Sequence, residues 1–305
     1  MLKIVFMGTP LFSVPILEAL IEEYEVIGVV TQPDKKVGRK QELMASPVKE
    51  CALRHNIPVF QPIKIRTDYE DIAALNPDLI VTAAYGQIVG MKLLNTPKYR
   101  SINVHASLLP KYRGGAPIHE AIKQGESETG VTIMYMEKGM DSGDILAQRK
   151  IPITDDDNSG TMFEKLSLLG RDLLLEVIPK LVNGEIKPIK QDETKVTFAY
   201  NVTKEEEKLD FTKPARMVFN HIRAYNPFPT AYMELGDDVV KVYDSRTSDE
   251  THNQKPGTII KTTKHGFLIA CGNGTTLEIL EVQPSGKKRM KASDYANGAL
   301  RKYLK

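Results

Sequence analysis

The first thirty residues constrain the fold most strongly, because they contain two different apolar patterns. Residues 2–7, LKIVFM, form a continuous apolar run, which is typical of a strand buried on both faces of a sheet. A Gly-Thr-Pro turn and a segment with apolar residues at helical spacing follow, and residues 26–30, VIGVV, form a second buried strand. A strand–helix–strand unit of this kind predicts a parallel, doubly wound sheet, and so an α/β fold.

The same alternation continues to about residue 185. Ser13 and Ser46 stand where they could cap helices, the second followed by a proline at the first helical position. Further strands are expected at 59–60, 78–85, 101–109, 129–136 and 146–153, and helices at 68–75, 117–123 and 159–183. We therefore predict a first domain over 1–187.

The chain changes character after this domain. Residues 188–208 are polar and contain an acidic run at 205–207, so they are expected to be a linker. Residues 209–305 hold short apolar runs separated by turn pairs such as Gly236-Asp237 and Pro256-Gly257. This spacing is typical of a small β-barrel or sandwich.

Composition excludes several classes of protein. A hydrophobic content of 41% with 26% charged residues is ordinary for a globular chain with a core. The sequence has no apolar run of membrane-spanning length and no secretory leader, so we expect a cytoplasmic protein without a membrane partner, and a monomer. Its two cysteines, Cys51 and Cys271, lie in different halves and predict neither a disulfide framework nor a metal site.

Polar residues interrupt the expected strand that begins at residue 101. Asn103 and His105 are two apart, so both face the same side of that strand, where they could stabilise an oxyanion and handle a proton. Asp141 lies between glycines in a turn and could orient the histidine. Asp144 is the competing acid, and it could instead cap the turn. For an isolated Asn-x-His pattern, simple hydrogen bonding to a loop is the more common role.

Missing motifs narrow the chemistry further. Gly8-Thr9-Pro10 has one glycine where a dinucleotide-binding turn needs three, which argues against hydride transfer. No Gly-x-Ser-x-Gly elbow supplies an acyl-enzyme nucleophile, and no His-x-x-x-His pair supplies a zinc site. The remaining reaction is direct transfer of a small carbonyl group to an uncharged nucleophile.

Two segments together resemble the folate-dependent formyltransferases: NVHASLLPKYRGGAPI at 103–118 and GMDSGDIL at 139–146. The resemblance implies a Rossmann-like domain that binds 10-formyltetrahydrofolate as formyl donor, without a metal. It implies Asn103, His105 and Asp141 as the catalytic set. It also implies a folate-contacting stretch formed by Ser107, Leu108, Leu109 and Pro110.

Other segments are similar to the methionyl-tRNA formyltransferase branch of this family, among them FMGTPLFSVPILEAL, TQPDKKVGR, QDETKVT, IRAYNPFPTAY and QPSGKKRM. This resemblance implies formyl transfer to the α-amine of methionyl-initiator tRNA in translation initiation, and an OB-fold-like tRNA-binding barrel over 209–305. It implies tRNA contacts by Lys35, Lys36, Arg39, Lys40, Lys287, Lys288 and Arg289. Without it, these cations would be read as solvated surface, and the acidic linker argues against phosphate contacts there.

Two alternatives to this function stay open at the level of sequence. The first keeps formyl transfer but gives it a small acceptor, such as an amino-sugar nucleotide or glycinamide ribonucleotide. An extra basic domain argues against it, since residues 209–305 carry a net charge of +5 against −3 for 1–208, which together give +2. The second is a non-catalytic tRNA-binding protein, which has no need for an Asn-His-Asp set.

Overall fold

The computed structural model describes residues 1–38, 41–298 and 300, and it divides into two compact units. Unit 1 comprises Met1–Pro117, Glu128–Pro152 and Phe163–Tyr200, and unit 2 comprises Ile118–Ser127, Ile153–Met162 and the chain from Asn201 onward. Each unit has its own sheet. Among the described residues, no helix combines the length and apolar character needed to cross a membrane.

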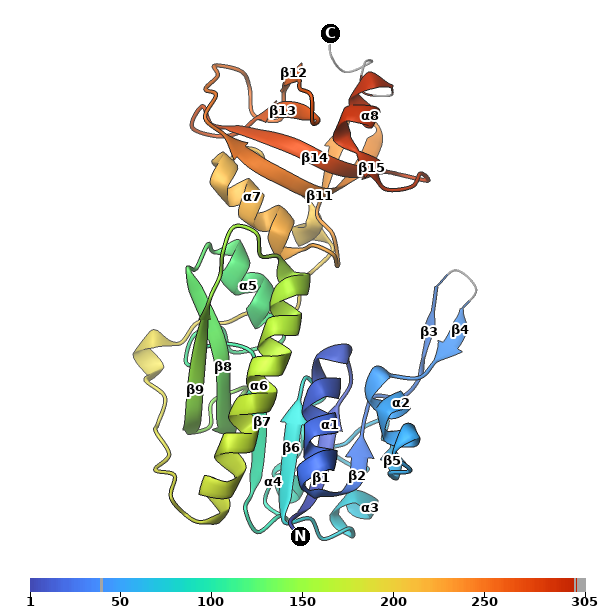
Figure 1. Ribbon diagram of the computed structural model, residues 1–305, viewed down its shortest axis with the longest axis vertical. Helices are drawn as coiled ribbons and strands as arrows, with labels where there is room; N and C mark the ends of the chain where they lie inside the picture. The colour runs from blue at the N-terminus through green and yellow to red at the C-terminus, as the bar shows by residue number, and fades with distance from the viewer. Residues whose placement is uncertain (39–40, 299, 301–305) are drawn as a thin grey trace. The chain divides into compact units, whose positions relative to one another are not determined.

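Unit 1 contains a seven-stranded sheet in the order β5-β2-β1-β6-β7-β8-β9 (Figure 1). Its strands are β1 (Lys3–Gly8), β2 (Glu25–Val30), β5 (Val59–Phe60), β6 (Leu79–Ala83), β7 (Ser101–His105), β8 (Glu128–Tyr135) and β9 (Ile145–Pro152). The first five strands of this order are parallel, whereas β8 and β9 are antiparallel to their neighbours. The predicted doubly wound, mostly parallel sheet is confirmed.

Helices cover both faces of this sheet. They are α1 (Val14–Glu23), α2 (Pro47–Arg54), α3 (Glu70–Ala73), α4 (Met91–Leu94) and α6 (Ser159–Val182), with short 3-10 turns at Leu11–Ser13 and Glu193–Lys195. A Cβ placed on Gly170 of α6 would lie 2.8 Å from Cγ1 of Val104, so α6 packs directly on β7. The other face carries α3 and α4, whose Ile72 and Leu93 are buried.

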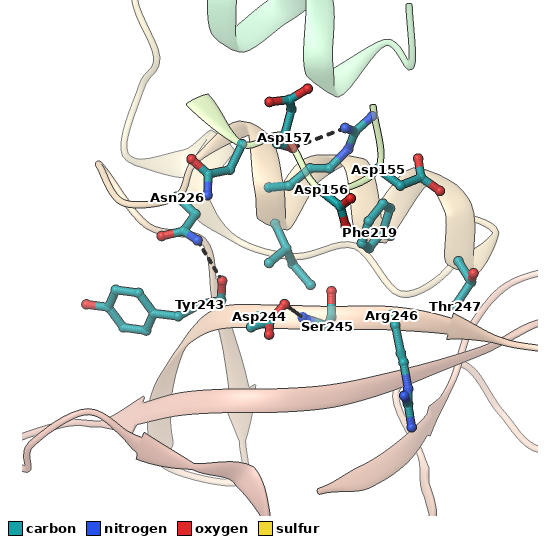
Figure 2. Close-up of a pocket in the computed structure, with 13 residues that line it drawn as sticks. Asp155, Asp156, Asp157, Phe219, Asn226, Tyr243, Asp244, Ser245, Arg246 and Thr247 are labelled. Atoms are coloured by element: carbon teal, nitrogen blue, oxygen red, sulfur yellow. Dashed lines mark hydrogen bonds between the residues drawn. The ribbon is translucent and has the colours of Figure 1, made fainter. Parts of the chain in front are cut away.

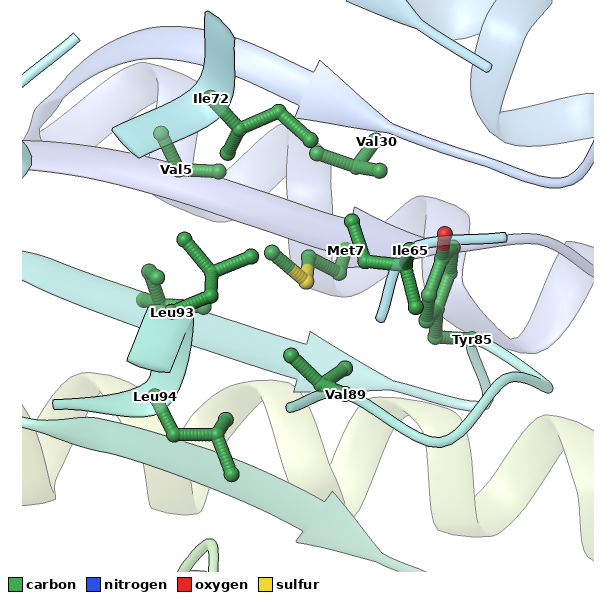
Figure 3. Close-up of a cluster of buried hydrophobic side chains, with 10 residues drawn as sticks. Val5, Met7, Val30, Ile65, Ile72, Tyr85, Val89, Leu93 and Leu94 are labelled. Atoms are coloured by element: carbon green, nitrogen blue, oxygen red, sulfur yellow. The ribbon is translucent and has the colours of Figure 1, made fainter. Parts of the chain in front are cut away.

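A hydrophobic cluster fills the space between the sheet and α3 and α4 (Figure 3). It contains Val5, Met7, Val30, Ile65, Ile72, Ile80, Tyr85, Val89, Leu93 and Leu94. On β1, Val5 and Met7 belong to this cluster, whereas Ile4 and Phe6 are fully buried without joining it. The central strand is therefore covered on both sides, as its continuous apolar run predicts.

Two local expectations can be compared directly with the structure. Ser46 caps α2 as predicted, because its Oγ accepts a hydrogen bond from the amide of Lys49 at 3.1 Å. Ser13 precedes α1 but makes no capping bond; its hydroxyl donates to the carbonyl of Ala83 at 2.6 Å and so joins α1 to β6. The polar segment 32–46 contains a hairpin of β3 (Lys35–Val37) and β4 (Glu42–Met44).

Unit 2 contains an antiparallel sheet in the order β10-β11-β14-β13-β12, with β15 beside β14. Its strands are β10 (Tyr232–Leu235), β11 (Asp238–Ser248), β12 (Ile259–Thr262), β13 (Phe267–Ala270), β14 (Thr276–Pro284) and β15 (Met290–Lys291), and its helices include α5 (Pro117–Lys123, from its second residue), α7 (Ala215–Ala224) and α8 (Ala292–Asn297). Val218 and Ile222 of α7 are buried. The curled antiparallel sheet has the form of a half-barrel, and it confirms the predicted small C-terminal β-barrel.

Unit 2 also contains a pocket of 340 Å³ between α7, the middle of β11 and the segment 155–158 (Figure 2). Arg223 anchors one wall, because its Nη1 donates to the carbonyls of Thr154 and Asp157 at 2.6 and 3.1 Å. Acidic side chains predominate among its charged lining residues, including Asp156 and Asp244. None of the predicted catalytic residues lines this pocket.

Unit 2 is expected to lose stability in mild acid, and His221 in α7 is expected to contribute to this loss. Burial lowers the pKa of this imidazole, and its Nε2 donates to the carbonyl of Glu206 at 2.8 Å. An unfolded histidine titrates near pH 6.5, so below about that pH the unfolded chain takes up a proton that the folded chain resists. The contribution of His221 to the free energy of unfolding is therefore present above this pH and is lost as the pH falls. Urea unfolding of wild type and His221→Gln, each followed at pH 7.5 and about 5.5, should show the smaller acid loss in the variant.

The matched control for this measurement is His265→Gln, at an exposed turn of unit 2. It should keep the acid sensitivity of the wild type. Equal acid losses in wild type and His221→Gln would show that His221 does not carry the effect.

Candidate active site

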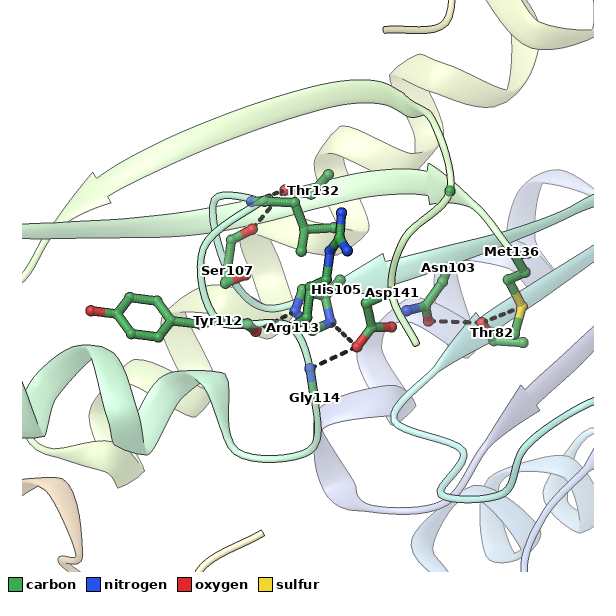
Figure 4. A network of polar contacts seen from close by, with 12 residues as sticks. Thr82, Asn103, His105, Ser107, Tyr112, Arg113, Gly114, Thr132, Met136 and Asp141 are labelled. Carbon is green, nitrogen blue, oxygen red and sulfur yellow. Dashed lines mark hydrogen bonds and ion pairs between the residues drawn. The ribbon is translucent and has the colours of Figure 1, made fainter. Parts of the chain in front are cut away.

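The carboxyl ends of β6 and β7 place the amide of Asn103. Thr82 lies opposite Asn103 in the parallel register, and its hydroxyl donates to Asn103 Oδ1 at 2.7 Å (Figure 4). Because Oδ1 accepts this bond, the amide nitrogen is turned the other way and can donate to a ligand. Thr82 is 2% exposed, so this orientation is set inside the sheet.

His105 ends β7 and is buried, with 5% of its surface exposed. Its Nε2 lies 3.0 Å from the carbonyl oxygen of Tyr112, and a carbonyl can only accept, so Nε2 carries a hydrogen. Nδ1 therefore holds the lone pair of the neutral ring, and it lies 3.7 Å from Asp141 Oδ2. That distance exceeds a hydrogen bond but lets the carboxylate stabilise a protonated ring.

Asp141 lies in the turn between β8 and β9, as its flanking glycines suggest. Its Oδ2 accepts the amide of Gly114 at 2.8 Å, so the oxygen nearest His105 is also fixed by the backbone. Asp144, the competing acid, closes the turn through its carbonyl, which accepts the amide of Tyr135 at 3.0 Å. The structure thus brings together the three residues predicted as the catalytic set.

Two residues of this site have left-handed backbones, with φ of +62° at Tyr112 and +47° at Asp141. Such a conformation costs a residue with a Cβ about 1–2 kcal/mol. The carbonyl of Tyr112 is the one that accepts a hydrogen bond from His105 Nε2. The carboxylate of Asp141 is the one that lies beside His105 Nδ1. The conformation of Tyr112 has no sequence signal, because glycine, asparagine and aspartate are the residues that usually adopt it.

A segment from the predicted linker holds the loop at 110–116. We call residues 189–200 the strap. Its Thr197 carbonyl accepts the amide of Arg113 at 2.9 Å, and its Ala199 amide donates to the Arg113 carbonyl at 2.8 Å. Farther back, Ile189 and Ile145 exchange two backbone bonds of 2.8 and 2.9 Å. The strap therefore runs beside both the 110–116 loop and β9.

Side chains of the strap reach the turn of Asp141. Gln191 Nε2 donates to the carbonyls of Asp141 and Gly143, both at 2.8 Å, and its Oε1 accepts from Arg113 at 2.8 and 3.0 Å. Arg113 is 4% exposed and also pairs with Glu193 at 2.8 Å, which lowers the pKa of that carboxyl. Sequence reasoning missed this network, although both the Arg113 and Gln191 segments were noted as motifs.

The stretch predicted to contact folate forms a loop fixed from β8. Thr132 is fully buried; its hydroxyl donates to the carbonyl of Ser107 at 2.6 Å and accepts the amide of Leu109 at 3.1 Å. Ser107 is also buried and donates to the carbonyl of Lys111, while Leu109 is buried beside Met134. Leu108 and Pro110 are half-buried.

The predicted tRNA-contacting cations lie in both units. Lys35 and Lys36 are exposed on β3, whereas Arg39 and Lys40 lie outside the described residues. Lys287 and Lys288 are exposed in the turn after β14. Arg289 is exposed too, but it forms an ion pair with Glu281 and lies 4.2 Å over the ring of Tyr243.

Comparison with known proteins shows what family this site belongs to. Residues 2–178 match the family described as formyl transferase, and residues 201–300 match the formyl transferase C-terminal domain. The chain belongs to the formyl transferase family. It is thus a transferase, and the family resemblance noted in the sequence is confirmed.

Members of this family with high identity span nearly the whole chain. The methionyl-tRNA formyltransferase of Pediococcus pentosaceus is 54% identical over 302 residues, which cover 98% of this chain and 94% of that protein. The methionyl-tRNA formyltransferase of Bacillus cytotoxicus is 53% identical over 302 residues, which cover 98% of this chain and 96% of that protein.

Solved structures of formyltransferases share the fold at low identity. An N-formyltransferase from Helicobacter canadensis, in complex with folinic acid and dTDP-3-aminofucose, has a TM-score of 0.72 at 21% identity and covers 92% of this chain and 99% of its own. A methionyl-tRNA formyltransferase from Clostridium thermocellum has a TM-score of 0.58 at 18% identity, and the match covers 84% of this chain and 96% of that one. These likenesses support the formyl transferase fold and do not distinguish one acceptor from another.

Proposed function

We propose that the protein transfers the formyl group of 10-formyltetrahydrofolate to the α-amine of methionyl-initiator tRNA, for translation initiation. The observation that carries this proposal is the identity of 54% over 98% of the chain to a methionyl-tRNA formyltransferase. The cluster of Asn103, His105 and Asp141 supports the proposal, since an oriented amide, an imidazole and a carboxylate suit transfer of a carbonyl group.

In the proposed reaction the lone pair of the amine attacks the formyl carbon, and the carbonyl electrons move onto its oxygen. Asn103 donates from its amide nitrogen to this oxyanion, and His105 stabilises it when Nδ1 is protonated. Asp141 stabilises the imidazolium and takes the proton of the attacking amine, directly or through water. The carbon–nitrogen bond to N10 of the folate then breaks, its electron pair stays on N10, and the proton taken from the amine is delivered there.

The donor is proposed to lie against the loop 107–110 of a formyltransferase domain over 1–187. A second domain over 209–305 is proposed to bind the tRNA. Ser107 is fully buried and bonded within the loop, so it would shape the donor site rather than touch the ligand. The half-buried Leu108 and Pro110 are the side chains available for contact. No step of this chemistry requires a metal.

The proposal is tested by mass analysis of methionyl-tRNA after incubation with the purified protein and 10-formyltetrahydrofolate. Formylmethionyl-tRNA should accumulate. Formylation of an amino-sugar nucleotide or glycinamide ribonucleotide instead, with no product on the tRNA, would replace the proposed acceptor. Binding of tRNA without any transfer would indicate a binding protein.

A tRNA acceptor predicts strong salt dependence of its binding. Each neutralised phosphate releases counterions, so a protein with four or so such contacts should lose about a hundred-fold in affinity between roughly 50 and 200 mM salt. Removing two contacts by Lys287→Gln with Lys288→Gln should reduce the log–log slope by about two. Filter binding of methionyl-tRNA over a salt series measures both effects.

The control for this pair is Lys150→Gln, at an exposed lysine of β9 that pairs with Glu128. It should leave the slope unchanged. A wild-type affinity that hardly varies with salt would argue for a small acceptor.

A further inference from the structure

Two aromatic side chains of the strap stand exposed and stacked on each other. Phe198 and Tyr200 have their ring centroids 5.7 Å apart and their planes 5° from parallel. They are 47% and 70% exposed, although each presents a large apolar face. Exposed apolar surface of this kind commonly marks a site of interaction.

The backbone between the two rings is held firmly. Ala199 is 1% exposed, and its amide and carbonyl bond to Arg113 and Ala116 at 2.8 and 3.0 Å. In an extended segment, residues two apart face the same side, so burial of Ala199 turns both aromatic residues outward. The pair is therefore preorganised by the strap and needs little ordering to accept a partner.

The same segment touches the proposed catalytic carboxylate through one glycine. The Ala199 carbonyl oxygen lies only 2.5 Å from where a Cβ on Gly114 would stand. The amide of Gly114 in turn donates to Asp141 Oδ2 at 2.8 Å. The aromatic pair thus belongs to the part of the strap that lies against the loop at 110–116, beside the proposed position of the reacting amine.

Cations accompany the aromatic pair. Lys195, three residues before Phe198, is exposed and forms an exposed ion pair with Asp192 at 3.2 Å. Lys111 is exposed beside Tyr112, whose amide bonds to Thr197 of the strap at 2.9 Å. Flat aromatic faces with nearby positive charge are what proteins use for single-stranded nucleic acid, because bases stack and phosphates pair. Neither feature alone selects this partner, but their combination does.

We propose that Phe198 and Tyr200 form a stacking platform for an unpaired base in the single-stranded 3′ end of the acceptor tRNA. This inference rests on the proposed function, since that end carries the amino acid to the site. The base continues the stack on the more exposed ring, Tyr200, and the following phosphates face Lys111 and Lys195. The platform holds the tail in position while its terminal amine lies at Asp141.

The double variant Phe198→Leu with Tyr200→Leu tests the platform, because it keeps apolar bulk but removes the flat faces. Loss of one stacked base should raise the KM for methionyl-tRNA about ten- to a hundred-fold. The KM for 10-formyltetrahydrofolate and kcat should not change. The matched control is Phe228→Leu, a 78% exposed aromatic residue of unit 2, which should leave all three constants unchanged.

Fluorescence gives a second readout that does not depend on turnover. The chain has no tryptophan, so Tyr200→Trp introduces a single reporter at the platform. Its emission should be quenched by methionyl-tRNA and unaffected by tRNA trimmed of its unpaired 3′ nucleotides. Equal quenching by both would contradict stacking by the tail.

The outcomes separate this inference from the function on which it rests. A wild-type enzyme that formylates methionyl-tRNA, with an unchanged tRNA KM in the double leucine variant, overturns the platform and leaves the function standing. A rise in the KM of the folate donor alone would assign the rings to the donor and likewise overturn it. If the wild-type enzyme formylates no tRNA, the proposed function is wrong, and the platform that rests on it is wrong too.

Discussion

Replacing His105 by alanine is expected to lower kcat about a hundred- to thousand-fold, and Asn103→Ala should do the same. The imidazole is buried between the Tyr112 carbonyl and the Asp141 carboxylate, so water cannot easily substitute for it. Asn103 is oriented by Thr82, which leaves its amide nitrogen to donate to the oxyanion. Steady-state formylation of methionyl-tRNA at saturating donor measures both losses.

Two exposed residues of the same types serve as controls. His55→Ala, just after α2, and Asn95→Ala, just after α4, should turn over at the wild-type rate. Circular dichroism and thermal unfolding would establish that the site variants remain folded. Near wild-type kcat in His105→Ala or Asn103→Ala would remove that residue from the catalytic set.

Gly114→Ala is expected to lower kcat about a hundred-fold by a purely steric route. A Cβ at this position would lie 2.5 Å from the Ala199 carbonyl oxygen, and φ is +125°, which favours glycine. The loop and the strap must therefore separate, and the amide that holds Asp141 Oδ2 moves with them. Overpacking should also cost about 1–3 kcal/mol of stability, which urea unfolding measures.

Gly184→Ala separates the steric effect from the conformational one. Gly184 also has a positive φ, +72°, but a Cβ there would meet nothing within 4 Å. This variant should lose some stability and keep its kcat. If Gly114→Ala formylates methionyl-tRNA as fast as Gly184→Ala, then the amide of Gly114 does not position Asp141 for the reaction.

Much of the fold could be predicted because its signals are local. The runs at 2–7 and 26–30 are apolar throughout, and a strand buried on both faces needs that pattern wherever it lies. Short elements were harder to find: α4 has one turn, and β3 and β4 have three residues each, with all three side chains of β4 exposed. Whether such a segment forms a loop or a hairpin depends on which residues pair across it, and composition does not encode that pairing.

The candidate site was predictable where residue types carry chemistry and unpredictable where the backbone does. Asn103, His105 and Asp141 stand out as polar residues in unusual places, so the sequence pointed to them. The Tyr112 carbonyl and the Gly114 amide are groups that every residue has, and only the path of the chain selects them. Thr82, Thr132 and Gln191 are ordinary polar residues until their partners are known.

The strap has a consequence for when the site can form as the chain is made. A nascent chain ending at residue 187 already contains all seven strands of the first sheet and all three proposed catalytic residues. It still lacks Gln191, Thr197 and Ala199, whose bonds hold the loop at 110–116 and the turn of Asp141. A chain of that length can therefore form the sheet before the loop is secured, and the geometry of the proposed site is completed only by the residues that lead out of the unit.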